Sequence, residues 1–411
     1  MADSVAAHRA RVLGALGPVP TVAVPLAAAA GCVTAADAVA ALAVPRFDNA
    51  AMDGYAVRAR DVAGPATLPV AGVVAAGAAW EGPLPEGAAV RIMTGAPVPA
   101  DADAVVPFEW TDRGADRVRI DRAVAADQHV RRAGEDVTAG AVAVPAGTLL
   151  RPAHLGLLAA TGCREVVVRR RPRVAVLATG AELGGASPQA ILSSSASADD
   201  RIACDDDLPP GHLPDSNSVT IAAAVRAAGG EATVWGPAPD ETDAFLALLA
   251  RAAADADLVL TTGGISAGDH DVVKAALADH ADTWFGSVAV KPGRPQGAGV
   301  LHVDGRDVPL VCLPGTPVAA YTSFRLFVEP ALAALRGTAT PREMRTLAAP
   351  ATTSPERTVV LPARLAPDGR VRLLPGHAGH SQQLLADADV LLVLPPGPSL
   401  VAGETVEVLP L

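Results

Sequence analysis

The feature that most constrains the fold is an alternation of apolar strand-like runs with helix-like runs across residues 173–313. Residues 173–179 (RVAVLAT) and 257–262 are apolar over most of their length, as expected for strands buried on both faces. A helix is predicted over residues 218–228 between them, with Asn217 as its N-cap. Alternation of this kind predicts a mostly parallel sheet with right-handed crossovers and helices on both faces.

The rest of the sequence has other patterns of apolar and turn-forming residues, and these patterns predict further domains. Alanine-rich runs predict helices in residues 1–45, and the helical periodicity returns after residue 145. Short β-favouring runs between Gly, Pro and Asp turns follow residue 46 and return near the C-terminus. We expect a multidomain chain with α/β and β parts. A helical linker domain is expected at residues 1–45 plus 145–171, with a β-rich domain inserted at 46–144. A three-layer α/β domain is expected at 172–337 and a small β-barrel-like domain at 338–411.

Composition limits the partners and the compartment. The formal net charge of -11 argues against nucleic acid or an anionic membrane as a partner, because both require a positive surface. The four cysteines are far apart and form no CxxC, so neither a disulfide framework nor a zinc site is expected. The N-terminus lacks the apolar core of a signal peptide, and the apolar stretch at residues 22–30 is too short to span a bilayer. These features predict a soluble cytoplasmic protein.

Ligands of parallel α/β sheets bind beyond the carboxyl ends of the strands, which places the chemistry in the loops after residues 179, 262 and 313. Residues 262–271 (TGGISAGDHD) are the most informative of these loops. Consecutive glycines after a buried strand let backbone amides converge on a phosphate or oxyanion. Asp269 and Asp271 would repel a bare phosphate, so their presence suggests that Mg²⁺ mediates the contact. Glycine-rich turns are common, however, and this one alone has moderate specificity.

Two further loops could bind an anion or a metal. Residues 179–183 (TGAEL) place Glu182 directly after a buried strand. Residues 291–295 (KPGRP) hold Lys291 and Arg294 in a proline-stiffened turn that suits an anion, although an ordinary basic surface turn is about as probable in isolation. A rigid LPGTP loop at 313–317 follows the last strand of the predicted sheet.

The predicted β-rich domain carries three polar segments. Residues 47–57 (FDNAAMDGYAV) concentrate groups that can bind polar ligands, yet a lone Asp-Gly turn is usually structural. Thr94 follows a strand-like run and could bind an oxyanion through its hydroxyl, but for this motif alone a capped turn is more probable. Residues 131–137 (RRAGEDV) contain charges that, taken alone, indicate solvated surface. Because no GxxxxGK[ST] loop or GxGxxG turn occurs, P-loop hydrolysis and Rossmann-type hydride transfer lose support.

Taken in order, these segments resemble one family, the molybdopterin molybdenumtransferases, which include bacterial MoeA and the E domain of gephyrin. The resemblance extends over residues 5–411. It is carried by FDNAAMDGYA at 47–56, TGAPVPADADAVV at 94–106, AGED at 133–136, TGAEL at 179–183, DSN at 215–217, TTGGISAGDHD at 261–271, KPGRP at 291–295 and LPGTP at 313–317. So many blocks in the correct order make a chance match very improbable.

The resemblance implies an elongated homodimer that converts adenylylated molybdopterin and molybdate to molybdenum cofactor and AMP, with Mg²⁺ as cofactor. The active site would lie between the molybdopterin-binding α/β domain of one subunit and the β-rich domain of the other. The upstream adenylyltransferase is a further expected partner. The implied catalytic residues are Asp53, Thr94, Asp136, Glu182, Asp240, Asp271 and Lys291, with Glu182 and Asp240 as metal ligands. The implied substrate-binding residues are Gly263, Gly264, Ser266, Asp269, Arg294, Pro314, Gly315 and Thr316.

The chain also departs from the family pattern. Thr316 stands where the family usually has Asn, Ala181 replaces a polar residue, and an arginine of the terminal domain falls at Pro362. A usual serine near Gly379 is missing or shifted, and the loop at 186–210 is longer than typical. These departures leave open a non-catalytic paralogue that acts as a molybdopterin-binding scaffold. A second alternative is a molybdopterin adenylyltransferase, because the α/β domain alone also resembles the enzyme of that preceding step.

Overall fold

The computed structural model describes residues 2–184, 208–266, 271–278, 282–340, 342–376 and 381–411. The chain divides into two compact units. One comprises Met1–Thr21 with Arg169–Leu411, and the other comprises Val22–Val168.

A six-stranded sheet forms the centre of the first unit, in the order β16-β13-β17-β21-β20-β18. The four strands from β16 to β21 are parallel, and β20 and β18 are antiparallel additions at one edge. The mostly parallel sheet expected from the sequence is therefore present. Its strands are β13 (Arg173–Thr179), β16 (Glu231–Ala238), β17 (Leu258–Thr262), β18 (Thr283–Ser287), β20 (Pro295–Val303) and β21 (Arg306–Leu313).

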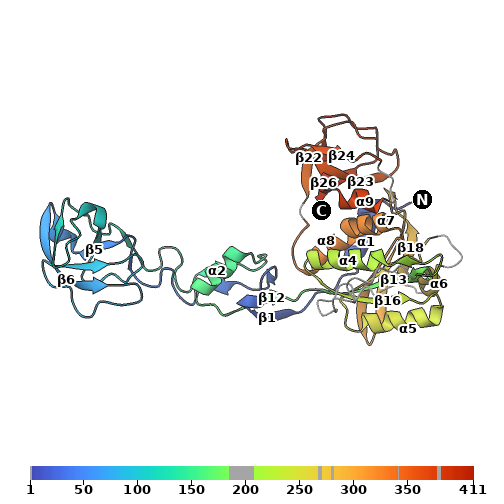
Figure 1. Cartoon of the computed structure of the whole chain (residues 1–411). Helices are drawn as coiled ribbons and strands as arrows, with labels where there is room; N and C mark the ends of the chain where they lie inside the picture. Colours follow the sequence, from blue (N-terminus) through green and yellow to red (C-terminus); the bar gives the residue numbers. More distant parts are fainter. Residues whose placement is uncertain (1, 185–207, 267–270, 279–281, 341, 377–380) are drawn as a thin grey trace. The chain divides into compact units, whose positions relative to one another are not determined.

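Helices cover both faces of this sheet, which gives the three layers that the sequence predicted. Val174 and Val176 of β13 belong to one hydrophobic core, whereas Ala175 and Leu177 belong to the other, because successive strand residues point to opposite faces. Figure 1 shows α4 and α8 on one side of β13 and β16 and α5 on the other. The helices are α1 (Val5–Gly14), α4 (Ser216–Ala227), α5 (Thr242–Ala253), α6 (Val272–Leu277), α7 (Pro317–Ser323), the π-helical η4 (Phe324–Val328) and α8 (Glu329–Leu335).

One detail of these helices differs from the prediction, and one of them is unusually apolar. The N-cap of α4 is Asp215, not Asn217, because the Asp215 carboxylate accepts the Ser218 backbone N–H at 2.9 Å. The run Pro317–Leu335 is apolar and long enough by composition to cross a membrane, but 78% of its most apolar window is buried inside the protein. It is therefore packed as a core helix of this unit.

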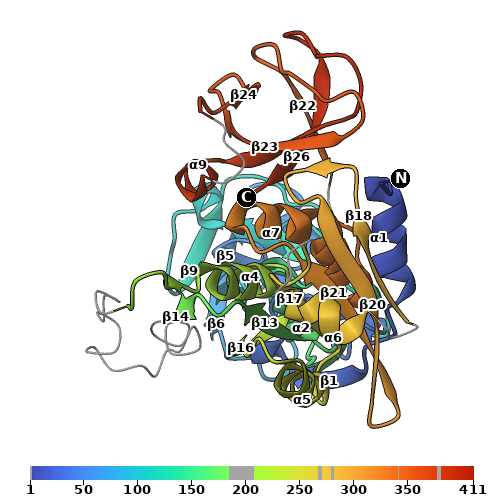
Figure 2. The same ribbon diagram turned by 90° about the vertical axis from the view of Figure 1, so that its right-hand side faces the viewer.

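Helix α1 also belongs to this unit and not to the linker domain to which the sequence assigned it. It packs against η4 and β20, and Figure 2 shows it beside β18. Fully buried His8 on α1 stacks edge-on against Phe327 at 4.6 Å between ring centroids and lies 5.3 Å from Trp284. The Nε2 atom of His8 is buried without a hydrogen-bond partner. Burial, followed by the positive charge of Arg11, lowers the pKa of His8 from 6.5 to about 4.

This histidine predicts a loss of stability in mild acid. Between pH 6.5 and about 4 the unfolded chain binds a proton at His8 and the folded chain does not, so falling pH destabilises the fold; above pH 6.5 the full stability is retained. In His8→Leu, we expect the free energy of unfolding to fall by on the order of 3 kcal/mol less between pH 6.5 and about 4 than in the unchanged protein. Urea unfolding followed by Trp284 fluorescence at pH 7 and pH 4.5 measures it, and parallel pH profiles for the two proteins would contradict it.

The C-terminal residues form a second sheet, in the order β19-β23-β25-β26-β22, with β24 paired to β23. Its own hydrophobic core includes Leu361, Val390 and Val408. The short strand β19 comes from the α/β part of the chain and pairs in parallel with β23, so the KPGRP segment begins on this sheet. The elements are β19 (Val290–Lys291), β22 (Glu343–Thr346), β23 (Thr358–Leu365), β24 (Val371–Leu373), α9 (Gln382–Ala386), β25 (Val390–Leu394) and β26 (Thr405–Pro410).

The second unit is mostly β-structure. Its main sheet has the order β8-β5-β7-β6-β9, as the short β-favouring runs after residue 46 predicted for a β-rich domain. A buried Tyr55 and Ile92 lie in separate cores on the two faces of this sheet. The strands are β5 (Gly54–Val57), β6 (Ala66–Val74), β7 (Ala89–Ile92), β8 (Ala104–Pro107) and β9 (Arg117–Ile120), accompanied by the short helices η2 (Ala59–Val62) and η3 (Phe108–Trp110).

The expected helical linker is instead a mixed structure. Only α1 is helical for more than one turn in residues 2–45, because the prolines and β-branched valines after Gly17 favour extended chain. Strand β12 pairs between β1 and β2, so the predicted return of the chain after residue 145 to its N-terminal segment is confirmed. The elements are β1 (Thr21–Pro25), η1 (Leu26–Ala28), β2 (Val33–Thr34), β3 (Ala38–Val39), β4 (Asn49–Ala50), β10 (Val130–Arg131), β11 (Val142–Val144), α2 (Pro152–Ala160) and β12 (Glu165–Arg169).

Candidate functional site

A cavity of about 1180 Å³ opens at the carboxyl ends of β13, β17 and β21. The loops that follow residues 179, 262 and 313 form its walls, as the parallel strand order predicts. Nine of the residues implied by the resemblance line it. They are Glu182, Asp240, Gly263, Gly264, Ser266, Asp271, Pro314, Gly315 and Thr316, with Asn217 as an addition from α4.

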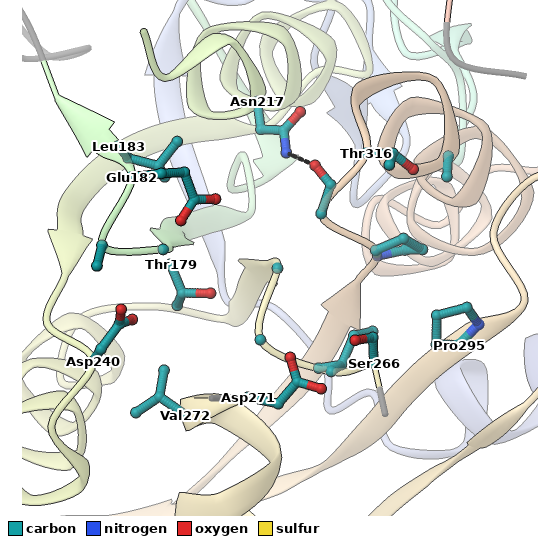
Figure 3. Close-up of a pocket in the computed structure, with 18 of the residues that line it drawn as sticks. Thr179, Glu182, Leu183, Asn217, Asp240, Ser266, Asp271, Val272, Pro295 and Thr316 are labelled. Carbon is teal, nitrogen blue, oxygen red and sulfur yellow. Dashed lines mark hydrogen bonds between the residues drawn. The ribbon is translucent and has the colours of Figure 1, made fainter. Parts of the chain in front are cut away.

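Three carboxylates reach this cavity from different elements (Figure 3). Glu182 follows β13, Asp240 precedes α5, and Asp271 is the N-cap residue of α6. The position of the Glu182 side chain depends on Gly180, two residues earlier. Gly180 has φ of 142°, and a Cβ there would lie 2.6 Å from both Glu182 carboxylate oxygens. Only glycine therefore leaves room for the observed Glu182 conformation. The described residues contain no group of three or more acidic, His or Cys side chains close enough to hold a metal by themselves.

The glycine turn after β17 packs closely on its neighbours. Gly263 and Gly264 have φ of 89° and 67°, and a Cβ on Gly263 would lie 2.8 Å from the Thr179 carbonyl oxygen. The Gly263 N–H donates to the Leu313 carbonyl at 3.1 Å, so this amide joins two loops and does not point to a ligand. The sequence predicted that both glycine amides converge on an anion; the structure shows that the amide of Gly263 is already used. Asp269 lies outside the described residues.

Asn217 is a site residue whose role sequence reasoning missed. Its Nδ2 donates to the Gly315 carbonyl at 2.7 Å, which connects the start of α4 to the LPGTP loop (Figure 3). Because Gly315 O can only accept, the orientation of the amide is fixed. The DSN block was the available signal, but the predicted N-cap role concealed it. The neighbouring Thr316 lines the cavity and begins α7 without a side-chain cap hydrogen bond.

The two cations of the KPGRP segment do not line this cavity, although Gly293 and Pro295 do. Lys291 instead lines a separate cavity of about 330 Å³ beside Arg357 and residues 352–355. The reason is the backbone: Lys291 pairs with Val359 at the end of β19, which directs this segment along the C-terminal sheet. Arg294 is exposed. Lys291 and Arg294 are therefore not among the residues that line the cavity of the glycine turn in this structure.

In the second unit, Asp53 and Thr94 form one cluster. Asp53 Oδ1 accepts from both the backbone N–H and the hydroxyl of Thr94, each at 2.7 Å. The backbone hydrogen bond, followed by that of the hydroxyl, lowers the pKa of Asp53 below its ordinary value. The residues are 41 positions apart in sequence, and the pairing of β5 with β7 brings them together. Asp53 is thus a fixed, ionised carboxylate at an exposed position.

Asp136 also lies in the second unit, in a loop that is held from both sides. Its backbone N–H donates to Val44 O at 3.0 Å, and the preceding turn is attached through Asp48. Asp48 accepts the Ala133 N–H at 2.8 Å and pairs with Arg132. The Ala133 backbone hydrogen bond is the main cause of the lowered pKa of Asp48. Asp136 itself is exposed and free to face a ligand.

Comparisons with known proteins cover almost the whole chain. Three family models match: the MoeA N-terminal region (domain I and II) at residues 3–162, a probable molybdopterin-binding domain at 175–334, and the MoeA C-terminal region (domain IV) at 345–411. Molybdopterin molybdenumtransferase 2 of Mycobacterium tuberculosis is 41% identical over 98% of both chains. Molybdopterin molybdenumtransferase of Bacillus subtilis is 33% identical over 89% of this chain and 84% of its own.

The fold comparison agrees with the sequence comparison. The crystal structure of a molybdopterin biosynthesis MoeA protein from Pyrococcus horikoshii matches with a TM-score of 0.80 at 27% identity and covers 99% of each chain. The family inferred from the ordered motifs is thereby confirmed, together with the multidomain fold. The chain belongs to the molybdopterin molybdenumtransferase (MoeA) family.

Proposed function

We propose that this chain transfers molybdenum from molybdate to adenylylated molybdopterin, releasing AMP and forming molybdenum cofactor. Membership of the family supports the reaction class. The structural observation that carries the proposal is the single cavity that brings Glu182, Asp240 and Asp271 to the glycine turn of β17. Its volume of about 1180 Å³ suits a ligand as large as a pterin joined to a nucleotide.

The donor set of this cavity fits Mg²⁺. Mg²⁺ is usually bound through one or two carboxylates, with phosphate oxygens and water completing the shell. Glu182 and Asp240 can supply those carboxylates, and the described residues offer no larger protein cage. When bound, the ion would supply Lewis-acid polarisation at the phosphate linkage. It would also offset the repulsion between that linkage and the acids.

The remaining contributions of the chain are positional. The three loops are tied together by Gly263 N–H to Leu313 O, by Asn217 to Gly315 O and by Thr179 Oγ1 to Thr262 O at 3.2 Å. A ligand that contacts all three loops is held in one orientation without rearrangement of the site, which lowers the entropic part of the barrier. We therefore assign catalysis to orientation and electrostatics and not to a covalent protein intermediate.

We further propose that the active form is a homodimer. In it, Asp53, Thr94 and Asp136 of the partner subunit would face the cavity and the incoming molybdate. The support for this arrangement is chemical: Asp136 and the Asp53–Thr94 cluster present polar groups on an exposed surface, and Thr94 holds the Asp53 carboxylate in position.

Molybdate-dependent release of AMP from adenylylated molybdopterin tests the function. We expect the purified chain to release one AMP for each molybdenum inserted, with no AMP formed when molybdate is omitted. ATP-dependent formation of adenylylated molybdopterin would instead identify an adenylyltransferase. Binding of the pterin without AMP release, in the presence of molybdate and Mg²⁺, would identify a scaffold.

A further inference from the structure

Gln296 is a buried amide that holds the KPGRP turn from the interior of the protein. It is the second residue of β20, and both it and Ser323, the last residue of α7, are only 1% exposed. The Gln296 Nε2 donates to the Gly293 carbonyl at 2.7 Å and to Ser323 Oγ at 2.7 Å. Because the Gly293 carbonyl can only accept, the orientation of the amide is fixed. These two hydrogen bonds, called here the Gln296 clamp, join the turn to α7.

The Gln296 clamp lowers stability in one respect. The Gln296 Oε1 atom is buried without a hydrogen-bond partner among the described residues. A buried acceptor that lacks a donor costs folding free energy, and an apolar methionine side chain of similar length would avoid that cost. Ser323 is also followed directly by the π-helical η4, and π-helical turns are frequent at functional sites. A buried polar group with this cost, bonded to the wall of a cavity, points to a function of the clamp.

The turn that the clamp holds lines two cavities. Gly293 and Pro295 line the main cavity, whereas Lys291 lines the smaller one. Gly293 has φ of 96°, and a Cβ there would lie 2.9 Å from Ser323 Oγ, so the close approach to the clamp requires glycine. On the other side of the turn, the Arg294 carbonyl accepts the backbone N–H of Val288 at 2.8 Å. The Gly293–Arg294 peptide is therefore held from both of its ends.

The clamp also decides which side of this peptide a ligand can meet. The Gly293 carbonyl points to the buried Gln296 amide. The peptide is trans, so its N–H, which belongs to Arg294, points away from the clamp. Within the described part of the chain, this N–H has no hydrogen-bond acceptor, and the residues on either side of it line the main cavity. A backbone N–H forms a charge-assisted hydrogen bond with an oxyanion, whereas a carbonyl oxygen in its place would repel one.

We propose that Gln296 is a positioning residue: it turns the Gly293 carbonyl inward and so presents the Arg294 N–H to a phosphate group of the ligand in the main cavity. This inference rests on the proposed function, which supplies that phosphate as the adenylate of the substrate and of the product AMP. Gln296 does not itself line the cavity. Its effect on the ligand therefore passes through the turn, and loss of the clamp should weaken contacts to the phosphate and not to the nucleoside.

The competing explanation is that Gln296 and Ser323 only fill the core. The chain contains a matched control for it. Thr322 precedes Ser323 on α7 and is equally buried, but its hydroxyl has no hydrogen-bond partner among the described residues. Thr322→Val therefore removes a buried hydroxyl from the same helix without breaking the clamp.

The test compares the binding of AMP and of adenosine to the full chain, in the presence of Mg²⁺, by isothermal titration calorimetry. We expect Gln296→Met, which keeps the length of the side chain, to weaken AMP binding at least about tenfold and adenosine binding less than about twofold. Ser323→Ala should weaken AMP binding severalfold, because the hydrogen bond to Gly293 remains but loses its support. Thr322→Val should bind AMP within about twofold of the unchanged protein.

Unchanged AMP affinity in folded Gln296→Met would overturn the proposal. An equal loss of AMP and adenosine affinity would also overturn it, because the whole cavity would then be disturbed, and so would an equal loss in Thr322→Val. If Gln296→Met does not fold, Ser323→Ala decides the question by the same comparison. The AMP-release assay separates this inference from the proposed function. A chain that releases no AMP but shows the phosphate-specific loss refutes the function only. An active chain in which Gln296→Met leaves the KM for adenylylated molybdopterin and the AMP affinity unchanged refutes the clamp only.

Discussion

Glu182→Gln is expected to lower molybdate-dependent AMP release by on the order of 10²-fold or more, since loss of a ligand should cost at least as much as loss of a residue that merely orients one. The substitution preserves the size of the side chain and removes its charge. Glu182 follows β13 in the wall of the cavity, and Gly180 leaves room for its carboxylate. If Glu182 and Asp240 bind Mg²⁺ together, the variant should also need a higher Mg²⁺ concentration for half-maximal rate. Saturating Mg²⁺ should then restore part of the activity.

Glu231 offers the control for this variant. It lies at the first position of β16, at the opposite end of the sheet from the cavity, and is exposed. Glu231→Gln removes the same charge and should leave both the rate and the Mg²⁺ dependence unchanged. Activity of Glu182→Gln equal to that of the unchanged protein, at all Mg²⁺ concentrations, would show that Glu182 neither binds the ion nor takes part in the reaction.

Mixing two inactive variants is expected to restore activity if the site is shared between subunits. Asp53→Asn and Glu182→Gln each disable every site in their own homodimers. Random exchange of subunits makes half of the dimers mixed, and each mixed dimer has one site in which both residues are intact. The mixture should therefore recover about a quarter of the activity of the unchanged protein, as the two-fold symmetry of a closed dimer requires.

The mixing experiment contains its own control. Asp53→Asn mixed with Thr94→Val should recover nothing, because both substitutions remove the same hydrogen-bonded cluster from the same domain. Recovery must also require subunit exchange, so samples mixed immediately before the assay should stay inactive. Absence of recovery after complete exchange, verified by mass spectrometry of the mixed dimer, would place all of these residues in one subunit.

The Asp53–Thr94 cluster changes the interpretation of the FDNAAMDGYAV segment. From the sequence alone, its acids and Asn could belong to an ordinary turn. In the structure, the segment leads into β5, and Thr94, which follows β7, donates its backbone N–H and its hydroxyl to Asp53. The carboxylate of Asp53 is thus held in one position by Thr94 and stays exposed.

The sequence by itself determined the elements whose signals are local. Continuous apolar runs predicted the strands β13 and β17. The alternation of strands and helices predicted a parallel sheet, and therefore a cavity at the loops after residues 179, 262 and 313. Positive φ values at Gly263 and Gly264 confirm that the turn requires glycine. The order of the motifs along the chain gave the family. Each of these inferences depends on neighbours in sequence or on rules that hold for every parallel sheet.

Only the tertiary structure decided which side chains share a cavity. Asn217 forms a hydrogen bond with Gly315, which is 98 positions away in the sequence. Lys291 does not line the main cavity, because its backbone pairs with β23. Helix α1 packs on the α/β domain and not on the segment that follows it. Such contacts depend on how whole elements pack, since a one-residue change in strand pairing redirects every side chain. Local pattern therefore predicts where a site lies, whereas long-range packing selects the groups that form it.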